Sequence, residues 1–228
     1  MNWPGVAMIA ASHHCPPRDE ALANNAVQLF GLMTALVGCG VLLEISSKLP
    51  NNRLFVGVVL YSFGLIMMLT SSTLYHARCG SPNAPLYQCL DHVAIFIMIA
   101  GSYSPISLGV IGGLSGLILF GTVWSAAAGG IVLRIYWPER FERVCVGLYL
   151  LLGWLILPVL PHMLDTMPGE GVALIMASGL IYTLGVAVYC SRRLRYQDAL
   201  WHACVVIAAA LHFAAILRDV VWPAVDAV

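Results

Sequence analysis

The chain has 228 residues, of which 60% are hydrophobic and only 10% are charged, whereas soluble domains average about 25% charged residues. A compact soluble protein of this size could not keep so much apolar surface away from water, so we expect an integral membrane protein. Eleven basic residues balance eleven acidic ones, and the absence of a basic excess excludes nucleic acid as a partner.

The first 23 residues differ from the rest of the chain. They contain a short apolar stretch, Val6–Ala11, which no Lys or Arg precedes, so the segment is not typical of a secretory signal. We predict a mobile tail over residues 1–23. Metal capture by His13, His14 and Cys15 is the alternative, and a disordered polar tail is the simpler interpretation.

Seven uncharged or nearly uncharged runs follow, and each is long enough for a tilted transmembrane helix. In chain order they are Val27–Ile45, Leu54–Tyr75, Leu90–Gly109, Leu114–Ile135, Val144–Leu160, Val172–Cys190 and Ala199–Val221. Alternating polarity over segments of about ten residues is missing, which argues against a transmembrane barrel. We therefore predict an all-α, polytopic membrane protein with one seven-helix domain over residues 24–223 and a short tail over residues 224–228.

The distribution of basic residues predicts the orientation, because cytoplasmic loops collect Lys and Arg. Eight of the eleven basic residues fall on the side of the N-terminal tail, and Lys48, Arg53 and Arg218 fall on the other side. We expect a cytoplasmic N-terminus and an external C-terminus.

Seven cysteines are scattered along the chain without any C-x-x-C pair, which is not typical of a disulfide framework or a zinc ribbon. Most of them are expected to act as small apolar fillers. Cys79 and Cys89 flank one turn and could pair on an oxidising side, but the charge pattern places that turn in the reducing cytoplasm.

Polar residues at the ends of three spans are the candidate functional residues, since ionisable groups are costly within a membrane. Alternating topology places the end of the second span and the starts of the third and seventh at one membrane face. The residues in this layer are Ser72, His76, Asp91, His92, Asp198 and His202. Glu44 belongs to the opposite face.

The spacing of these residues suggests a metal site. Ser72 and His76 are four residues apart, as are Asp198 and His202, so each pair shares one helix face. His76, His202 and Asp198 could supply three zinc ligands, with Asp91 orienting water or a ligand. A hydrogen-bonded network at the helix ends is the competing interpretation, and Asp198 could instead pair with nearby arginines, Arg192, Arg193 or Arg195.

Two further histidines receive supporting roles. His92 is turned by about 100° from Asp91 on a helix. His212 lies ten residues beyond His202, about 15 Å along the axis, which is too deep for direct ligation but suitable for lining a cavity.

Several motifs together resemble the hemolysin III family. They are Ser72–His76 (STLYH), Leu90–Ile95 (LDHVAI), Ile99–Pro105 (IAGSYSP), Trp201–His202 and Leu211–Phe213 (LHF). The similarity runs from about Asn24 to Pro223. That family is related to the progestin and adipoQ receptors (PAQR) and lies in the seven-span superfamily (CREST) of metal-dependent hydrolases that includes alkaline ceramidases.

The resemblance implies a zinc ion near the cytoplasmic face, a lipid substrate and a location in the bacterial inner (cell) membrane. By position, His76 and His202 are the matching histidines and Asp91 is the aspartate of the third span. The chain departs from the family where Asp198 replaces the first histidine of the last motif. Either Asp198 completes a two-histidine, one-carboxylate site, or metal binding is weakened.

Three functions therefore compete. The first is a zinc-dependent hydrolase of a lipid amide or ester, in which Asp91 acts as base and Ser72 hydrogen-bonds water or the developing oxyanion. The second is a receptor-like or membrane-perturbing (cytolytic) protein with a structural metal. The third, a small-solute transporter, predicts polar, broken helices at the midplane, a pattern that only Gly101–Pro105 and His212 approach.

Overall fold

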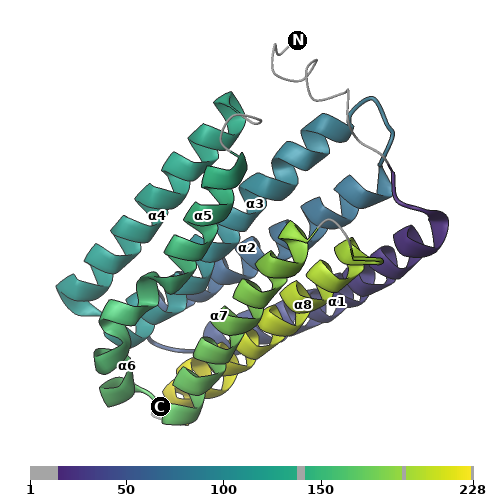
Figure 1. Cartoon of the computed structure of the whole chain (residues 1–228). Coiled ribbons are helices and arrows are strands. Elements are labelled where there is room, and N and C mark those ends of the chain that lie inside the picture. Colours follow the sequence, from purple (N-terminus) through teal and green to yellow (C-terminus); the bar gives the residue numbers. More distant parts are fainter. Residues whose placement is uncertain (1–14, 138–141, 192–193, 227–228) are drawn as a thin grey trace.

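A computed structural model describes residues 15–137, 142–191 and 194–226. The regular structure of these residues is entirely helical, with no strand, and the helices run side by side as a bundle (Figure 1). Seven helices are long and apolar enough to cross a membrane. The predicted all-α, seven-span fold is confirmed.

The helix bounds follow the predicted spans with extensions at their ends. The elements are α1 (Arg18–Ser46), α2 (Asn52–Ala77), α3 (Ala84–Pro105), η2 (Ile106–Ile111), α4 (Gly113–Tyr136), α5 (Glu142–Gly153), η3 (Trp154–Val159), α6 (Leu160–Thr166), α7 (Gly169–Cys190), α8 (Gln197–Ala215), η4 (Ile216–Val221) and α9 (Trp222–Asp226). The fifth span combines α5, η3 and α6, and the seventh extends from α8 into α9.

Turn residues explain several of these boundaries. The Asn51 side chain caps α2 by accepting hydrogen bonds from the backbone N–H groups of Arg53 and Leu54, both at 3.1 Å, as expected for an N-cap asparagine. Gly112 and Gly113 adopt positive φ angles of 60° and 55°, which allows the tight hairpin between η2 and α4. After Pro105, the third span continues as the π-helical segment η2.

The helices form a closed arrangement in which the first and last spans meet. α1 packs against both α2 and α8, α3 packs against α2 and α4, and α5 contacts α3 and α7. α7 and α8 form another close pair. The bundle therefore places the ends of α2 and α7 beside the starts of α1, α3 and α8.

The most extensive helix contact among the described residues joins α2 to α3. A Cβ atom added to Gly57 would lie 2.8 Å from the Ser104 carbonyl oxygen, and one added to Gly101 would lie 2.8 Å from that of Leu60. Small residues allow helix backbones to approach this closely in membranes. This contact fixes the start of α2 relative to the end of α3.

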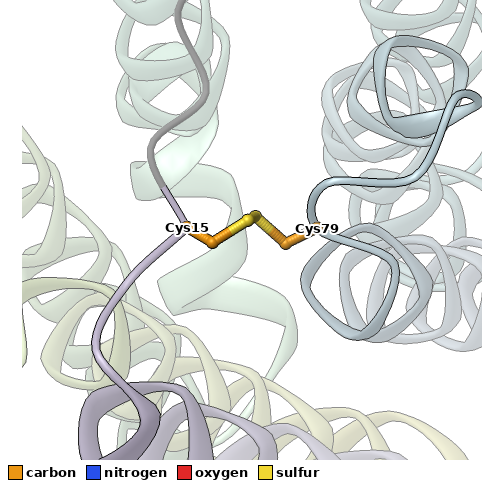
Figure 2. The surroundings of a disulfide bond; sticks show 2 residues. All are labelled: Cys15 and Cys79. Carbon is orange, nitrogen blue, oxygen red and sulfur yellow. A yellow bond between two sulfur atoms is a disulfide. The ribbon is translucent and has the colours of Figure 1, made fainter.

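The N-terminal segment contains more helix than the sequence predicts. α1 begins at Arg18, so residues 18–23, which we assigned to the mobile tail, are helical. The proposed metal ligands His13 and His14 lie outside the described residues. Cys15 lies just before α1 and forms a disulfide with Cys79, which follows α2 (Figure 2).

The disulfide corrects the expectation for the cysteines. Cys79 is bonded to Cys15, and Cys89 is a free, half-buried thiol. The spacing of the cysteines does not predict this pair. Cys15 lies beside the end of α2 because α1 begins as early as Arg18. The bond lies at the face where basic residues collect, although disulfides are rare in the cytosol. The orientation of the N-terminus therefore stays a prediction.

The α2–α3 contact predicts that replacing a glycine within it destabilises the protein more than replacing a glycine that faces open space. We expect Gly101→Ala to lower the free energy of unfolding by about 1–3 kcal/mol, since the new methyl group would overlap backbone that cannot rotate away. Gly129→Ala is the matched control, because a Cβ atom there has no neighbour within 4 Å. Thermal unfolding in detergent compares the variants, and equal melting temperatures would contradict the contact.

The disulfide predicts that the effects of replacing its two cysteines on stability are not additive. Cys15→Ser and Cys79→Ser are each expected to lower stability by about 2 kcal/mol, and the double variant should be no worse than either single one, because all three remove the same bond. Thermal unfolding without reductant measures this. Cys190→Ser, which removes an exposed free thiol, should have no effect. A stable single variant would show that the bond does not form.

Candidate functional site

One cavity of about 280 Å³ lies between α2, α3, α5, α7 and α8. All seven of the predicted site residues line it, namely Ser72, His76, Asp91, His92, Asp198, His202 and His212. Most of the remaining lining is apolar or aromatic. The polar residues of the helix ends thus open into a largely hydrophobic space, which is typical of a small-molecule site.

His202 is the most constrained of these residues. It is buried, and its Nδ1 lies 2.7 Å from the Asn24 side-chain oxygen while its Nε2 lies 3.1 Å from the Ser72 hydroxyl. An amide oxygen can only accept a hydrogen bond, so Nδ1 carries the proton. The Nε2 lone pair therefore points toward Ser72.

The Ser72 hydroxyl faces two acceptors. Besides His202 Nε2, at 3.1 Å, it lies close enough to the Asp91 carboxylate to interact with it. A hydroxyl has one proton to donate, so one of the two acceptors lacks a donor from Ser72. This end of the cavity is consequently rich in lone pairs and suited to a cation or to a ligand that donates hydrogen bonds.

His76 and Asp198 complete the polar layer. The ring of His76 meets that of His202 edge-on, with centroids 4.9 Å apart, and Asp198 interacts electrostatically with His76. The donor types suit zinc, which binds imidazole nitrogen and carboxylate oxygen. However, among residues 15–137, 142–191 and 194–226, no three His, Cys, Asp or Glu side chains lie close enough together to hold one metal ion.

Arg195 does not form the ion pair with Asp198 that the sequence left open, because it pairs with another carboxylate. The Arg195 guanidinium lies 2.9 Å from Asp19 on α1, and the Tyr196 hydroxyl donates to the same carboxylate at 3.1 Å. Arg192 and Arg193 lie outside the described residues. The contacts of Asp19 hold the start of α1 against the start of α8.

The two supporting histidines have separate surroundings. His92 Nδ1 donates to the Gln88 carbonyl oxygen at 2.7 Å, and the His92 carbonyl accepts a hydrogen bond from Tyr149 at 3.0 Å. His212 is buried further along α8, next to Ser178. His92 therefore anchors the start of α3 to α5, whereas His212 belongs to the deeper cavity.

Three buried polar residues around this site were not predicted from the sequence. Asn24 and Gln28 are each only 1% exposed, and Arg134 is 4% exposed. Gln28 accepts a hydrogen bond from Thr73, and Arg134 interacts electrostatically with Asp91. Asn24 and Gln28 could have been predicted from their spacing. They lie four residues apart at the start of an apolar run, so they share one helix face.

Comparison with known proteins identifies the family. The family model described as "Haemolysin-III related" matches residues 19–213. The chain is 28% identical to the "Hemolysin-3 homolog" of Bacillus subtilis (strain 168) over 87% of this chain and 93% of that protein.

Two further relatives show similar coverage. "Hemolysin-3" of Bacillus cereus is 28% identical over 87% of this chain and 90% of its own length. The human "Monocyte to macrophage differentiation factor" is 28% identical over 92% of this chain and 88% of its own. No solved structure matches the chain significantly. The chain is an integral membrane protein that belongs to the haemolysin-III related family.

Proposed function

We propose that the chain is a zinc-dependent hydrolase of a lipid amide or ester, in the bacterial inner membrane, with its site near the cytoplasmic face. The observation that carries the proposal is the Ser72 hydroxyl between two acceptors at the polar end of an apolar cavity. Such an end would bind a cation and the polar group of a lipid, while the apolar lining would receive the lipid chain.

His76, His202 and Asp198 would hold the zinc ion. When bound, zinc would act as a Lewis acid toward a substrate carbonyl and would increase the acidity of water. Asn24 supports this assignment because it accepts the Nδ1 proton of His202, and metal-binding histidines commonly donate their second N–H in this way.

Asp91 and Ser72 would carry the proton transfer and the orientation of the substrate. Asp91 would take a proton from the attacking water and return it to the leaving amine or alcohol. Ser72 would donate a hydrogen bond to water or to the carbonyl oxygen as negative charge develops there. Arg134 lies close enough to Asp91 to interact with its charge.

Zinc content tests the metal assignment. We expect purified protein to contain about one zinc ion per chain, and His76→Ala and His202→Ala to lose it. Asn24→Ala should weaken zinc binding about tenfold by releasing the His202 ring, and Asp198→His should strengthen it. His162→Ala, which changes an exposed histidine of α6, is the control. Zinc-free protein with unaltered stability in both histidine variants would refute the site.

Hydrolysis tests the reaction. We expect fatty acid release from vesicles doped with a long-chain N-acyl amide or an acyl ester, and Asp91→Asn should lower kcat about 10²–10⁴-fold with zinc content unchanged. Asp165→Asn, at an exposed carboxylate of α6, is the matched control. Full activity of Asp91→Asn would exclude it as the base.

A second candidate function has one observation in its favour. The relative from Bacillus cereus is named "Hemolysin-3", which suggests a membrane-perturbing protein with a structural metal. Dye leakage from the same vesicles distinguishes the candidates. Leakage that persists in Asp91→Asn and His76→Ala, without fatty acid release, would favour membrane perturbation over hydrolysis.

A further inference from the structure

A second, smaller cavity of about 110 Å³ lies beside the large one. His76 lines both cavities. Asn24, whose side-chain oxygen accepts the proton of His202, also lines the small cavity. The small cavity therefore reaches the polar layer by a route that does not pass through the large one. None of the steps proposed above uses it.

The small cavity has a different chemical character from the large one. It lies where the start of α1 meets the end of α2, and it has room for several water molecules. Two of its lining residues, Cys15 and Ala77, are exposed at this end of the bundle. Polar side chains make up much of the remaining wall. The full lining is Cys15, Pro16, Ala21, Asn24, Asn25, His76, Ala77 and Cys79.

The Cys15–Cys79 disulfide forms part of this wall. It joins the segment before α1 to the turn after α2, as Figure 2 shows. Pro16 lines the small cavity next to the bond. Neither Pro16 nor Pro17 has a backbone N–H with which to anchor the segment. The disulfide is therefore the covalent link that holds Cys15 and Pro16 across the end of α2.

The start of α1 is held by other contacts. The Asp19 carboxylate accepts hydrogen bonds from Arg195 at 2.9 Å and from Tyr196 at 3.1 Å. The Pro17 carbonyl oxygen accepts one from the Ala21 N–H at 2.9 Å. These contacts do not depend on the disulfide. Breaking the bond would therefore free the residues before Pro17 and leave α1 in place.

We propose that the small cavity is an aqueous entrance to the polar layer and that the Cys15–Cys79 disulfide closes it. In the open state, water and small hydrophilic solutes would pass Asn24 and Asn25 to reach His76. The apolar lining of the large cavity leaves that space to hydrocarbon. The entrance itself requires neither zinc nor a substrate, and only its use in hydrolysis rests on the proposed function.

Reduction by a dithiol would open the entrance through thiol–disulfide exchange. One thiolate of the reductant would attack the exposed sulfur of Cys15, which breaks the S–S bond and releases Cys79 as a thiolate. The second thiol would then displace Cys15, so that the reductant becomes a disulfide and its two electrons and two protons end on the two cysteines. The predicted orientation places this bond at the cytosol, where disulfides are usually transient or redox-sensing.

Labelling by diethyl pyrocarbonate tests the entrance, because this reagent acylates accessible, neutral imidazole rings. Peptide mass spectrometry gives the labelling rate of each histidine in metal-free protein in nanodiscs, before reduction and after treatment with dithiothreitol and its removal. We expect reduction to raise the rate at His76 about tenfold, since a freed terminal segment opens at little cost in free energy. His92 lines the large cavity but not the small one, so its rate should not change.

Cysteine variants show whether the disulfide causes the difference. Cys15→Ser and Cys79→Ser should each label His76 at the fast rate with or without reductant. Cys190→Ser is the matched control, because it removes an exposed free thiol and should keep the response to reduction. The exposed His162 of α6 corrects for differences in reagent concentration.

Several outcomes would overturn the proposal. They are equal rates at His76 before and after reduction, a slow rate in both Cys15→Ser and Cys79→Ser, and free thiols at Cys15 and Cys79 after mild oxidation. An equal rise at His92 would indicate general loosening of the bundle and would also refute the entrance. A rate at His76 that depends on the disulfide would support it even in a protein that bound no zinc and cleaved no lipid.

Discussion

The hydrogen bond between His202 and Asn24 determines much of the arrangement at the polar end of the bundle. A membrane interior supplies no water to pair with polar side chains, so each one must find a partner within the protein. Asn24 and His202 are both buried and satisfy each other across the contact between α1 and α8. The same bond holds the His202 proton on Nδ1 and so directs the Nε2 lone pair toward Ser72. One contact thereby joins the first and last spans and prepares the site.

The polar end of the cavity and the deeper region around His212 differ in the hydrogen-bonding groups that have no partner. At the polar end, Ser72 has too few protons for His202 and Asp91 together, so a cation or a donor group would complete it. Deeper in the bundle, one ring nitrogen of His212 presents a lone pair to a neighbouring oxygen, and the buried hydroxyls of Tyr61 and Tyr182 have no hydrogen-bond partner among the described residues. The two regions therefore differ in the polar groups that the protein itself leaves unsatisfied.

Hydropathy and spacing predicted the fold and the layer of polar residues, because both depend on period and on alternating topology. They could not predict the Cys15–Cys79 disulfide or the role of Asn24, since these depend on where α1 begins and on how it packs. The close contact at Gly57 and Gly101 was missed for a related reason. The sequence shows that a glycine is present, but only the packed backbones show which glycines permit contact and which face open space.

Position 198, where the resemblance to the family implies a histidine, shows how the length of a side chain limits the reach of a site residue. The start of α8 is held by the contacts of Arg195 and Tyr196 with Asp19, and Tyr196 adopts the left-handed backbone conformation at a φ of 58°. Such a conformation is strained for a non-glycine residue and persists only where surrounding contacts enforce it. With the backbone held in this way, Asp198 can approach His76 and His202 only through its short side chain, whereas the longer histidine of the family pattern would extend further from the same Cα atom. This difference in reach is a physical reason why the three side chains do not form a ready coordination shell.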